Sequence, residues 1–186
     1  MFLIILVIVV FVMQIALISY FRRNIEQASL KGGYEIVTSI LIACLCWVIR
    51  LILFIMPIFV DVRHFPFWLV LIGIITMITG LFICIVASAE IGRFATNALK
   101  FVSDHQLVKS GLYKYIRHPI YTGNILLFMG ASITLSNMYV IIVVMCVLVP
   151  AYVYRIKIEE EMLLSTFKDE YRDYMRKTKK LIPFVF

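Results

Sequence analysis

One polar segment of the chain gathers residue types that can bind charged groups and move protons. Between Ser103 and Tyr121 it carries two histidines, an arginine and several lysines and tyrosines, with Arg117-His118-Pro119 directly before an apolar run. A basic interfacial segment with aromatic residues would account for the lysines and tyrosines. It would not account for the histidines or for Arg-His-Pro, so we interpret the segment as a candidate site. Neither histidine has a third metal ligand at suitable spacing, so no metal site is predicted.

A second polar segment holds three adjacent carboxylates, Glu159 to Glu161, just after the last apolar run. Buried carboxylates at a membrane boundary need partners. If the helix continues, Arg155 and Glu159 are i,i+4 neighbours. We expect Glu161 on a solvated helix face. Glu159 and Glu160 are expected either to pair with nearby basic residues or to lie beside a cationic ligand.

The elements that must position these residues are membrane helices. Hydrophobic residues make up 63% of the 186 residues, charged residues make up 16%, and the mean hydropathy is +1.00. Soluble domains carry about 45–50% apolar and about 25% charged residues. The composition therefore excludes a soluble or disordered chain. The net charge of +7 does not indicate nucleic acid, because the basic residues flank apolar runs. The four cysteines lie inside apolar runs and are interpreted as buried packing residues.

Five apolar segments are predicted to cross the membrane as helices, the last two as a hairpin around Ser136-Asn137. These segments are Met1–Tyr20, Ile36–Val60, Pro66–Ala89, Ile120–Leu135 and Tyr139–Tyr154. Arg50, inside the second, is expected to pair or to extend towards the interface. Sixteen of the 18 Lys and Arg residues lie in the first loop, the third loop and the tail. The positive-inside rule then makes that side cytoplasmic and puts the N-terminus outside. The third loop and the tail would meet there.

The two polar segments resemble the signature of the isoprenylcysteine carboxyl methyltransferase and phospholipid methyltransferase superfamily. The first half reads Gly111-x-Tyr113-x-x-x-Arg117-His118-Pro119-x-Tyr121. The second half reads Arg155-x-x-x-Glu159-Glu160-x-x-Leu163-x-x-x-Phe167, followed by Tyr171, Tyr174, Thr178 and Pro183. Together they cover about residues 103 to 186. Asp104 and Lys168 stand at turn positions where the family usually has glycine, which concerns backbone shape more than chemistry.

The resemblance implies one membrane methyltransferase domain, 1–186, with three N-terminal spans (1–89) and a cofactor-binding, catalytic core (90–186). It implies S-adenosyl-L-methionine as the methyl donor, held on the cytosolic side between the loop before the hairpin and the tail. The implied cofactor-binding residues are His105, Leu107, Val108, Gly111, Tyr113, His118, Pro119, Tyr121, Glu159 and Glu160. The candidate catalytic residues are Arg117, Arg155 and Glu160.

The expected acceptor is lipid-like and enters from the bilayer. A carboxylate, as in isoprenylcysteine-type O-methylation, is ionised near neutral pH and needs only orientation and desolvation, with Arg117 or Arg155 holding it. A phospholipid amine, a phenol or a polyketide-type hydroxyl would need a base, for which Glu160 and His118 are candidates. An NADPH-dependent membrane reductase and a non-catalytic membrane protein stay as alternatives. The expected location is a prokaryotic plasma membrane.

Overall fold

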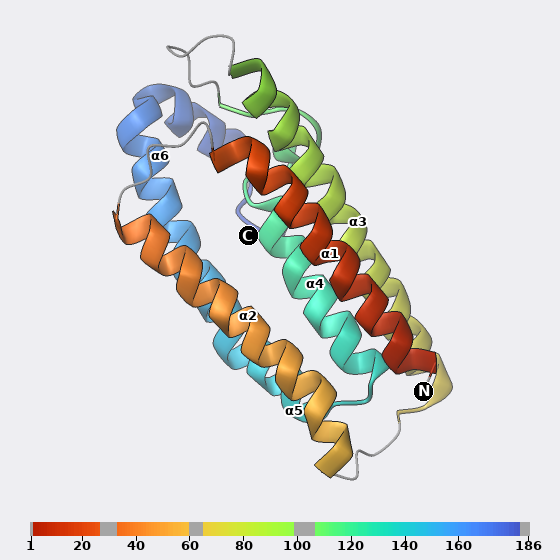
Figure 1. Cartoon of the computed structure of the whole chain (residues 1–186). Helices are drawn as coiled ribbons and strands as arrows, with labels where there is room; N and C mark the ends of the chain where they lie inside the picture. Colours follow the sequence, from red (N-terminus) through yellow and green to blue (C-terminus); the bar gives the residue numbers. More distant parts are fainter. Residues whose placement is uncertain (1, 27–32, 60–64, 99–106, 183–186) are drawn as a thin grey trace.

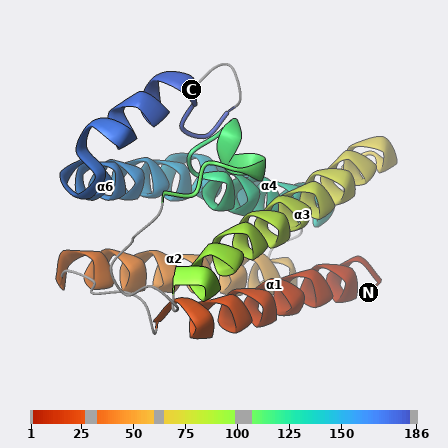
Figure 2. The same ribbon diagram turned by 90° about the horizontal axis from the view of Figure 1, so that it is seen from above.

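The computed structural model describes residues 2–26, 33–59, 65–98 and 107–182, and within them it is helical, with no strand. The helices lie side by side in an elongated bundle (Figure 1). Viewed from above, α1 and α2 form one layer, α4 and α6 form another, and α3 crosses obliquely beside α4 and α1 (Figure 2). The elements are α1 (Phe2–Glu26), α2 (Gly33–Phe59), α3 (Phe67–Ala98), the 3-10 turn η1 (Gly111–Lys114), α4 (Pro119–Thr134), α5 (Met138–Val143), the π-helical turn η2 (Val144–Leu148) and α6 (Val149–Lys177).

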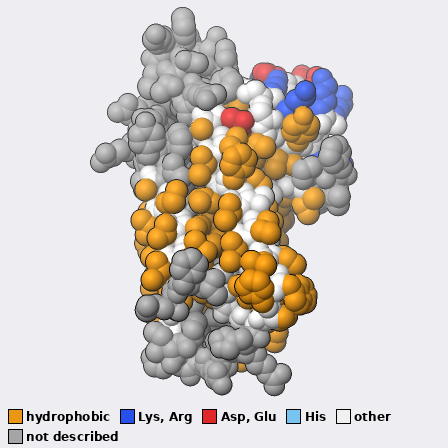
Figure 3. Space-filling model, turned by 90° about the vertical axis from the view of Figure 1, so that its right-hand side faces the viewer, with side chains coloured by type: hydrophobic (Ala, Val, Ile, Leu, Met, Phe, Trp, Pro, Cys, Tyr) orange, Lys and Arg blue, Asp and Glu red, His pale blue; other side chains and the backbone are white. Residues whose placement is uncertain are grey.

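Apolar side chains cover the outside of the bundle. On α3, Trp68, Ile75 and Phe82 are all more than 60% exposed. Of the side chains that Figure 3 draws in colour, the apolar ones cover the middle of the molecule and the charged ones lie towards one end. Among the described residues, Phe67–Ile91 and Met138–Lys177 are long and apolar enough to cross a membrane. Such a surface suits lipid rather than water around the helices.

The predicted hairpin between the last two apolar segments is confirmed. Helix α4 ends at Thr134, and Ser136 takes a left-handed conformation with φ 55°. The Asn137 side chain then accepts a hydrogen bond from the Val140 backbone N–H at 3.1 Å, which caps the first turn of α5. Because the turn is this short, α5 returns directly beside α4.

The backbones of α3 and α4 come into close contact at glycine residues. Gly73 and Gly80 on α3 face Gly123 and Gly130 on α4. A Cβ atom placed on Gly80 would lie 2.5 Å from the Leu127 backbone nitrogen. Small residues allow this close packing between membrane helices, where hydrophobic burial offers little. The contact holds α4, and thus the polar segment before it, rigidly against α3.

The hairpin's second arm runs into the polar tail as one continuous helical path. Pro150 has no N–H to offer the Cys146 carbonyl, and the helix widens into η2 just before it. Helix α6 then continues to Lys177, with one break at Lys168 (φ 46°, ψ −116°). At this break the chain turns back towards the segment before α4 (Figure 1).

The interpretation of all four cysteines as buried is wrong for two of them. Cys46 and Cys84 are buried, whereas Cys44 and Cys146 are exposed on α2 and η2. An exposed apolar thiol is tolerated where the surroundings of a helix are themselves apolar. Hydropathy alone does not distinguish the two faces of such a helix, because both are apolar.

Candidate active site

The segment before α4 and the segment after α6 lie side by side, as the sequence predicted. The Arg117 N–H donates to the Lys179 carbonyl at 2.8 Å, and the His118 N–H donates to the Lys180 carbonyl at 3.1 Å. In return the Lys179 N–H donates to the Tyr115 carbonyl at 3.2 Å. This short parallel pairing makes the tail one wall of the site and places the side chains of Arg117 and His118 against α6.

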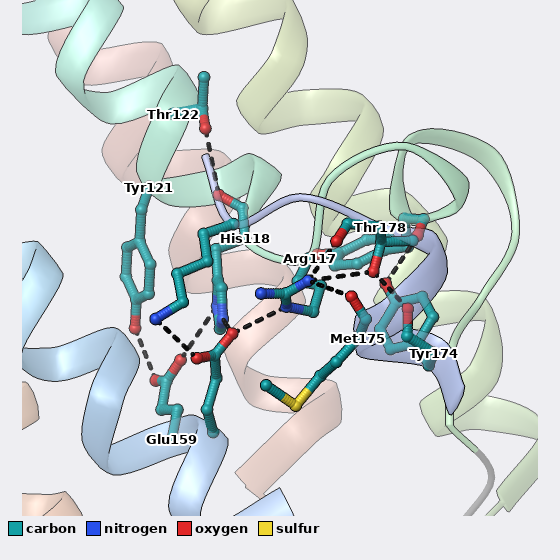
Figure 4. A network of polar contacts seen from close by, with 11 residues as sticks. Arg117, His118, Tyr121, Thr122, Glu159, Tyr174, Met175 and Thr178 are labelled. Carbon is teal, nitrogen blue, oxygen red and sulfur yellow. Dashed lines mark hydrogen bonds and ion pairs between the residues drawn. The ribbon is translucent and has the colours of Figure 1, made fainter. Parts of the chain in front are cut away.

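Arg117 ties the two segments together. Its side chain is buried, and Nε donates to Glu160 Oε1 at 2.8 Å. Its Nη1 donates to the carbonyl oxygens of Met175, at 3.2 Å, and of Thr178 (Figure 4). The guanidinium therefore makes these hydrogen bonds to α6 and to Thr178, the first residue after α6.

Glu160 is a buried carboxylate beside two cations and a histidine ring. Besides Arg117, Lys180 Nζ lies 3.1 Å from Oε2, and His118 Nε2 lies 3.6 Å from Oε1. Burial raises the pKa of Glu160, but His118, Arg117 and Lys180 together outweigh burial and lower it to about 2. Glu160 is thus a fixed anion at neutral pH, and a carboxylate with such a pKa is a weak general base.

Glu159 is the more accessible of the two carboxylates. Its Oε1 accepts hydrogen bonds from the Tyr121 hydroxyl at 2.6 Å and from Arg155 Nε at 3.0 Å. Its Oε2 lies 3.6 Å from His118 Nδ1. The predicted i,i+4 contact between Arg155 and Glu159 is confirmed, and Glu161 is exposed as expected.

Three stacked rings lead from these carboxylates into the bundle. The His118 and Tyr121 rings stack with centroids 5.8 Å apart, and the Tyr121 and Tyr152 rings stack at 4.9 Å. We call this set the aromatic column. At its inner end the Tyr152 hydroxyl lies 3.4 Å from Cys46 Sγ. Sequence reasoning missed Tyr152, although it stands three residues before Arg155 and seven before Glu159, on the same helix face.

Two buried polar atoms of the site have no hydrogen-bond partner in the described part of the chain. They are His118 Nε2 and the Tyr171 hydroxyl. Burial, and then the nearby charge of Glu160, raise the pKa of Tyr171. Buried polar atoms normally find partners, so unpaired ones beside a carboxylate mark a place where a polar ligand would be bound.

Glu90 is a second residue that sequence reasoning missed. Its carboxylate oxygens accept from the Leu112 N–H at 3.2 and 3.1 Å, which holds the start of η1. Gly111 has φ 57°, and a Cβ there would collide with the Glu90 carboxylate. The glycine of the motif is thus required both for its conformation and for room. The Tyr174 hydroxyl donates to the Tyr113 carbonyl at 2.6 Å, so η1 is also fixed from α6.

The structure brings six of the predicted site residues into one network of polar and ring contacts: Arg117, His118, Tyr121, Arg155, Glu159 and Glu160. Gly111 and Tyr113 lie on η1 beside it, and Pro119 is buried at the first turn of α4. Leu107 and Val108 are half-buried in the segment leading to η1. His105 lies outside the described residues. Among the described residues, no cluster of three His, Cys, Asp or Glu side chains suits a metal ion.

Several known proteins have sequences similar to this chain. The chain is 31% identical to the protein-S-isoprenylcysteine O-methyltransferase of Saccharomyces cerevisiae over 134 residues, 68% of this chain and 56% of the yeast protein. It is 28% identical to a probable protein-S-isoprenylcysteine O-methyltransferase of Oryza sativa subsp. indica over 167 residues, 88% of this chain and 84% of the rice protein. The model of the isoprenylcysteine carboxyl methyltransferase family matches residues 70–165, which include Gly111 through Glu160. The chain therefore belongs to the isoprenylcysteine carboxyl methyltransferase family.

Proposed function

We propose that this protein is an S-adenosylmethionine-dependent methyltransferase that methylates the carboxylate of a lipid-like acceptor at the membrane. The observation that carries the proposal is the position of His118, buried between Glu159 and Glu160, with Nε2 making no hydrogen bond within the described part of the chain. Relatives of the chain are named protein-S-isoprenylcysteine O-methyltransferases. That name favours an isoprenylcysteine-type carboxylate over the reductase and non-catalytic alternatives.

The residues present suit this methyl donor. A sulfonium and an ammonium group are attracted to carboxylates and to aromatic faces, and both are offered by Glu159 and Tyr121. The donor's own carboxylate can accept from the unpaired His118 nitrogen or the Tyr171 hydroxyl. Both oxygens of Glu160 face cations of the chain, whereas the contact that the described residues show for Glu159 Oε2 is with His118, at 3.6 Å. We therefore assign the contact with the donor to Glu159 and the organisation of the site to Glu160.

The protonation state of Glu160 favours a carboxylate acceptor. When bound, the donor supplies a methyl group that transfers to an acceptor oxygen as its carbon–sulfur bond breaks, the bonding electrons staying on sulfur. An acceptor carboxylate is already ionised near neutral pH, so the site has only to align and desolvate the two reactants. An amine or a phenol would require a base, and a pKa of about 2 makes Glu160 unsuited to that role, which leaves His118 as the other candidate.

Arg117 and Arg155 act as positioning residues in this proposal. Arg117 holds Glu160 and the tail, and Arg155 holds Glu159. Fixing the two glutamates replaces the role expected from the sequence, in which one of the two arginines holds the acceptor carboxylate.

The proposed setting is a bundle of five membrane-crossing segments with the N-terminus outside. The site then lies on the cytoplasmic face, and the acceptor reaches it from the bilayer. The apolar outer surface and the gathering of charge at one end support this arrangement (Figure 3). A prokaryotic plasma membrane stays a prediction.

The test is S-adenosylmethionine binding to the detergent-purified protein by calorimetry. The wild type should bind saturably, and His118→Ala should weaken binding at least about tenfold, the loss of one charge-assisted hydrogen bond. Tyr115→Ala is the matched control, because that exposed ring lies in the same segment and should leave binding unchanged. Absence of binding by a protein whose circular dichroism shows a helical fold would refute the methyltransferase proposal, and NADPH would be tested next.

Acceptor class is tested with labelled donor. N-acetyl-S-farnesylcysteine should be methylated, whereas its methyl ester and phosphatidylethanolamine should not. Methylation of the amine lipid instead would overturn the assignment of a carboxylate acceptor.

A further inference from the structure

Arg50 is a buried cation in the middle of α2. Its side chain is only 8% exposed, and Nη2 donates to Gln14 Oε1 of α1 at 2.7 Å. Gln14 Nε2 in turn donates to Asn124 Oδ1 of α4. The expectation that Arg50 pairs within the protein is thus confirmed, but its Nε is buried and has no hydrogen-bond partner.

No anion balances this charge in the described part of the chain. The other surroundings of the guanidinium are aromatic rings, those of Phe11, Phe128 and Trp47 at 4.8, 5.0 and 5.6 Å from its central carbon. Rings and a neutral amide lower the cost of burying a cation but leave its charge in place. Buried charges in proteins are normally paired, and an arginine in hydrocarbon is costly. Among the described residues, two other arginines, Arg117 and Arg155, are buried, and both face glutamates.

The position of Arg50 links it to the candidate active site. Cys46 stands one helical turn before Arg50 on α2 and contacts the Tyr152 hydroxyl. Tyr152 is the inner ring of the aromatic column, whose outer ring is His118. Arg50 therefore lies at the inner end of the column, on the membrane side of the two glutamates. It precedes the segment 70–165 that matches the family model, so the match assigns it no role.

We propose that Arg50 binds the carboxylate of the lipid-like acceptor. The inference rests on the function proposed above, an acceptor that reaches the site from the bilayer with its carboxylate ionised. Such a carboxylate needs a cation once it leaves water, and an arginine fork with an unpaired N–H offers a charge-assisted hydrogen bond. Methylation turns the carboxylate into a neutral ester, which removes the ion pair. Arg50 thus favours the acid over the methyl ester and promotes product release.

The test uses three substitutions that separate charge from packing. Arg50→Gln removes the cation. Gln14→Glu places a carboxylate of the protein beside Arg50, so it neutralises the cation from within while retaining a hydrogen-bond acceptor. Gln14→Leu removes the hydrogen bond to Gln14 without adding charge. Each variant is assayed for methylation of N-acetyl-S-farnesylcysteine, for calorimetric binding of S-adenosylmethionine and for thermal unfolding in detergent.

We expect Arg50→Gln and Gln14→Glu to raise the acceptor KM by about 10- to 100-fold, as for loss of a charged hydrogen bond. Donor affinity should stay unchanged in both, and Gln14→Glu should unfold at or above the wild-type temperature. Gln14→Leu should lower the unfolding temperature with little change in KM. The wild type should prefer the acid over its methyl ester as a competitive ligand, and Arg50→Gln should lose that preference.

A Gln14→Glu variant with unchanged KM and raised unfolding temperature would show that Arg50 serves packing alone, and the inference would fail. It would also fail if phosphatidylglycerol, without acceptor, stabilised the wild type but not Arg50→Gln, because the anion would then be a lipid phosphate. Failure of the wild type to bind S-adenosylmethionine would instead refute the proposed function itself.

Discussion

Replacing Lys168 with glycine should stabilise the protein. Lys168 is the single break in α6, with φ 46° and ψ −116°. Residues other than glycine rarely adopt this conformation. Its side chain is exposed and makes no ion pair among the described residues. Such a backbone costs about 1–3 kcal/mol for a residue with a Cβ atom. The extra unfolded-state freedom of glycine costs about 0.5–1 kcal/mol. The net gain is therefore about 1 kcal/mol.

A gain of that size corresponds to a rise of about 2–4 °C in unfolding temperature for a chain of this length. The assay is thermal unfolding of detergent-purified protein followed by far-ultraviolet circular dichroism. Lys168→Ala keeps the Cβ atom and should show no gain. Lys157→Gly, at an exposed position with regular helical backbone, should lower the unfolding temperature, because glycine costs about 1 kcal/mol inside a helix. If Lys168→Gly is destabilising like Lys157→Gly, residue 168 does not hold the left-handed conformation.

Two further predictions concern the helix contact and the buried glutamate. Gly130→Ala would set a Cβ atom 2.7 Å from the Gly73 carbonyl oxygen. The substitution should therefore destabilise the protein by about 1–3 kcal/mol in the same unfolding assay. An unchanged unfolding temperature would contradict the close helix contact. Glu160→Gln leaves the buried Arg117 and the half-buried Lys180 without their anion and should cost about 3–5 kcal/mol at neutral pH. Because the pKa of Glu160 falls from 4.5 to about 2 on folding, the wild type should keep this stabilisation above pH 4.5 and lose about 3 kcal/mol as the pH falls through 2. Glu160→Gln should lack that loss, and parallel pH profiles of the two proteins would contradict the assigned pKa.

The sequence predicted those features that depend on local pattern. Long apolar runs predicted the helices, and the Ser136-Asn137 pair predicted the hairpin turn. The distribution of basic residues predicted that the segment before α4 meets the tail, which the pairing of Arg117 with Lys179 confirms. The departure at Lys168 marked the place where the backbone is strained.

The features that sequence reasoning missed depend on single contacts between distant parts of the chain. Glu90 lies 22 residues before Leu112, and nothing in the sequence near α3 indicates that its carboxylate supports η1. Tyr152 sits in an apolar run, where an aromatic residue is ordinary. The hydrogen bonds of Arg117 could not be predicted from the motif either, because two of its acceptors are the main-chain carbonyls of Met175 and Thr178. Every residue has a main-chain carbonyl, so the residue type does not indicate which carbonyl accepts a hydrogen bond.

The pairing between the segment before α4 and the tail also has a consequence for biosynthesis. Arg117 and its partner Thr178 are 61 residues apart, and translation proceeds at about 5–20 residues per second. For about 3–12 s, a nascent chain therefore carries Arg117 and His118 without the wall that holds them. Over that interval the hairpin can already insert while no competent site exists. The proposed site can therefore form only after Thr178 has been synthesised, when the helices of the hairpin are already complete.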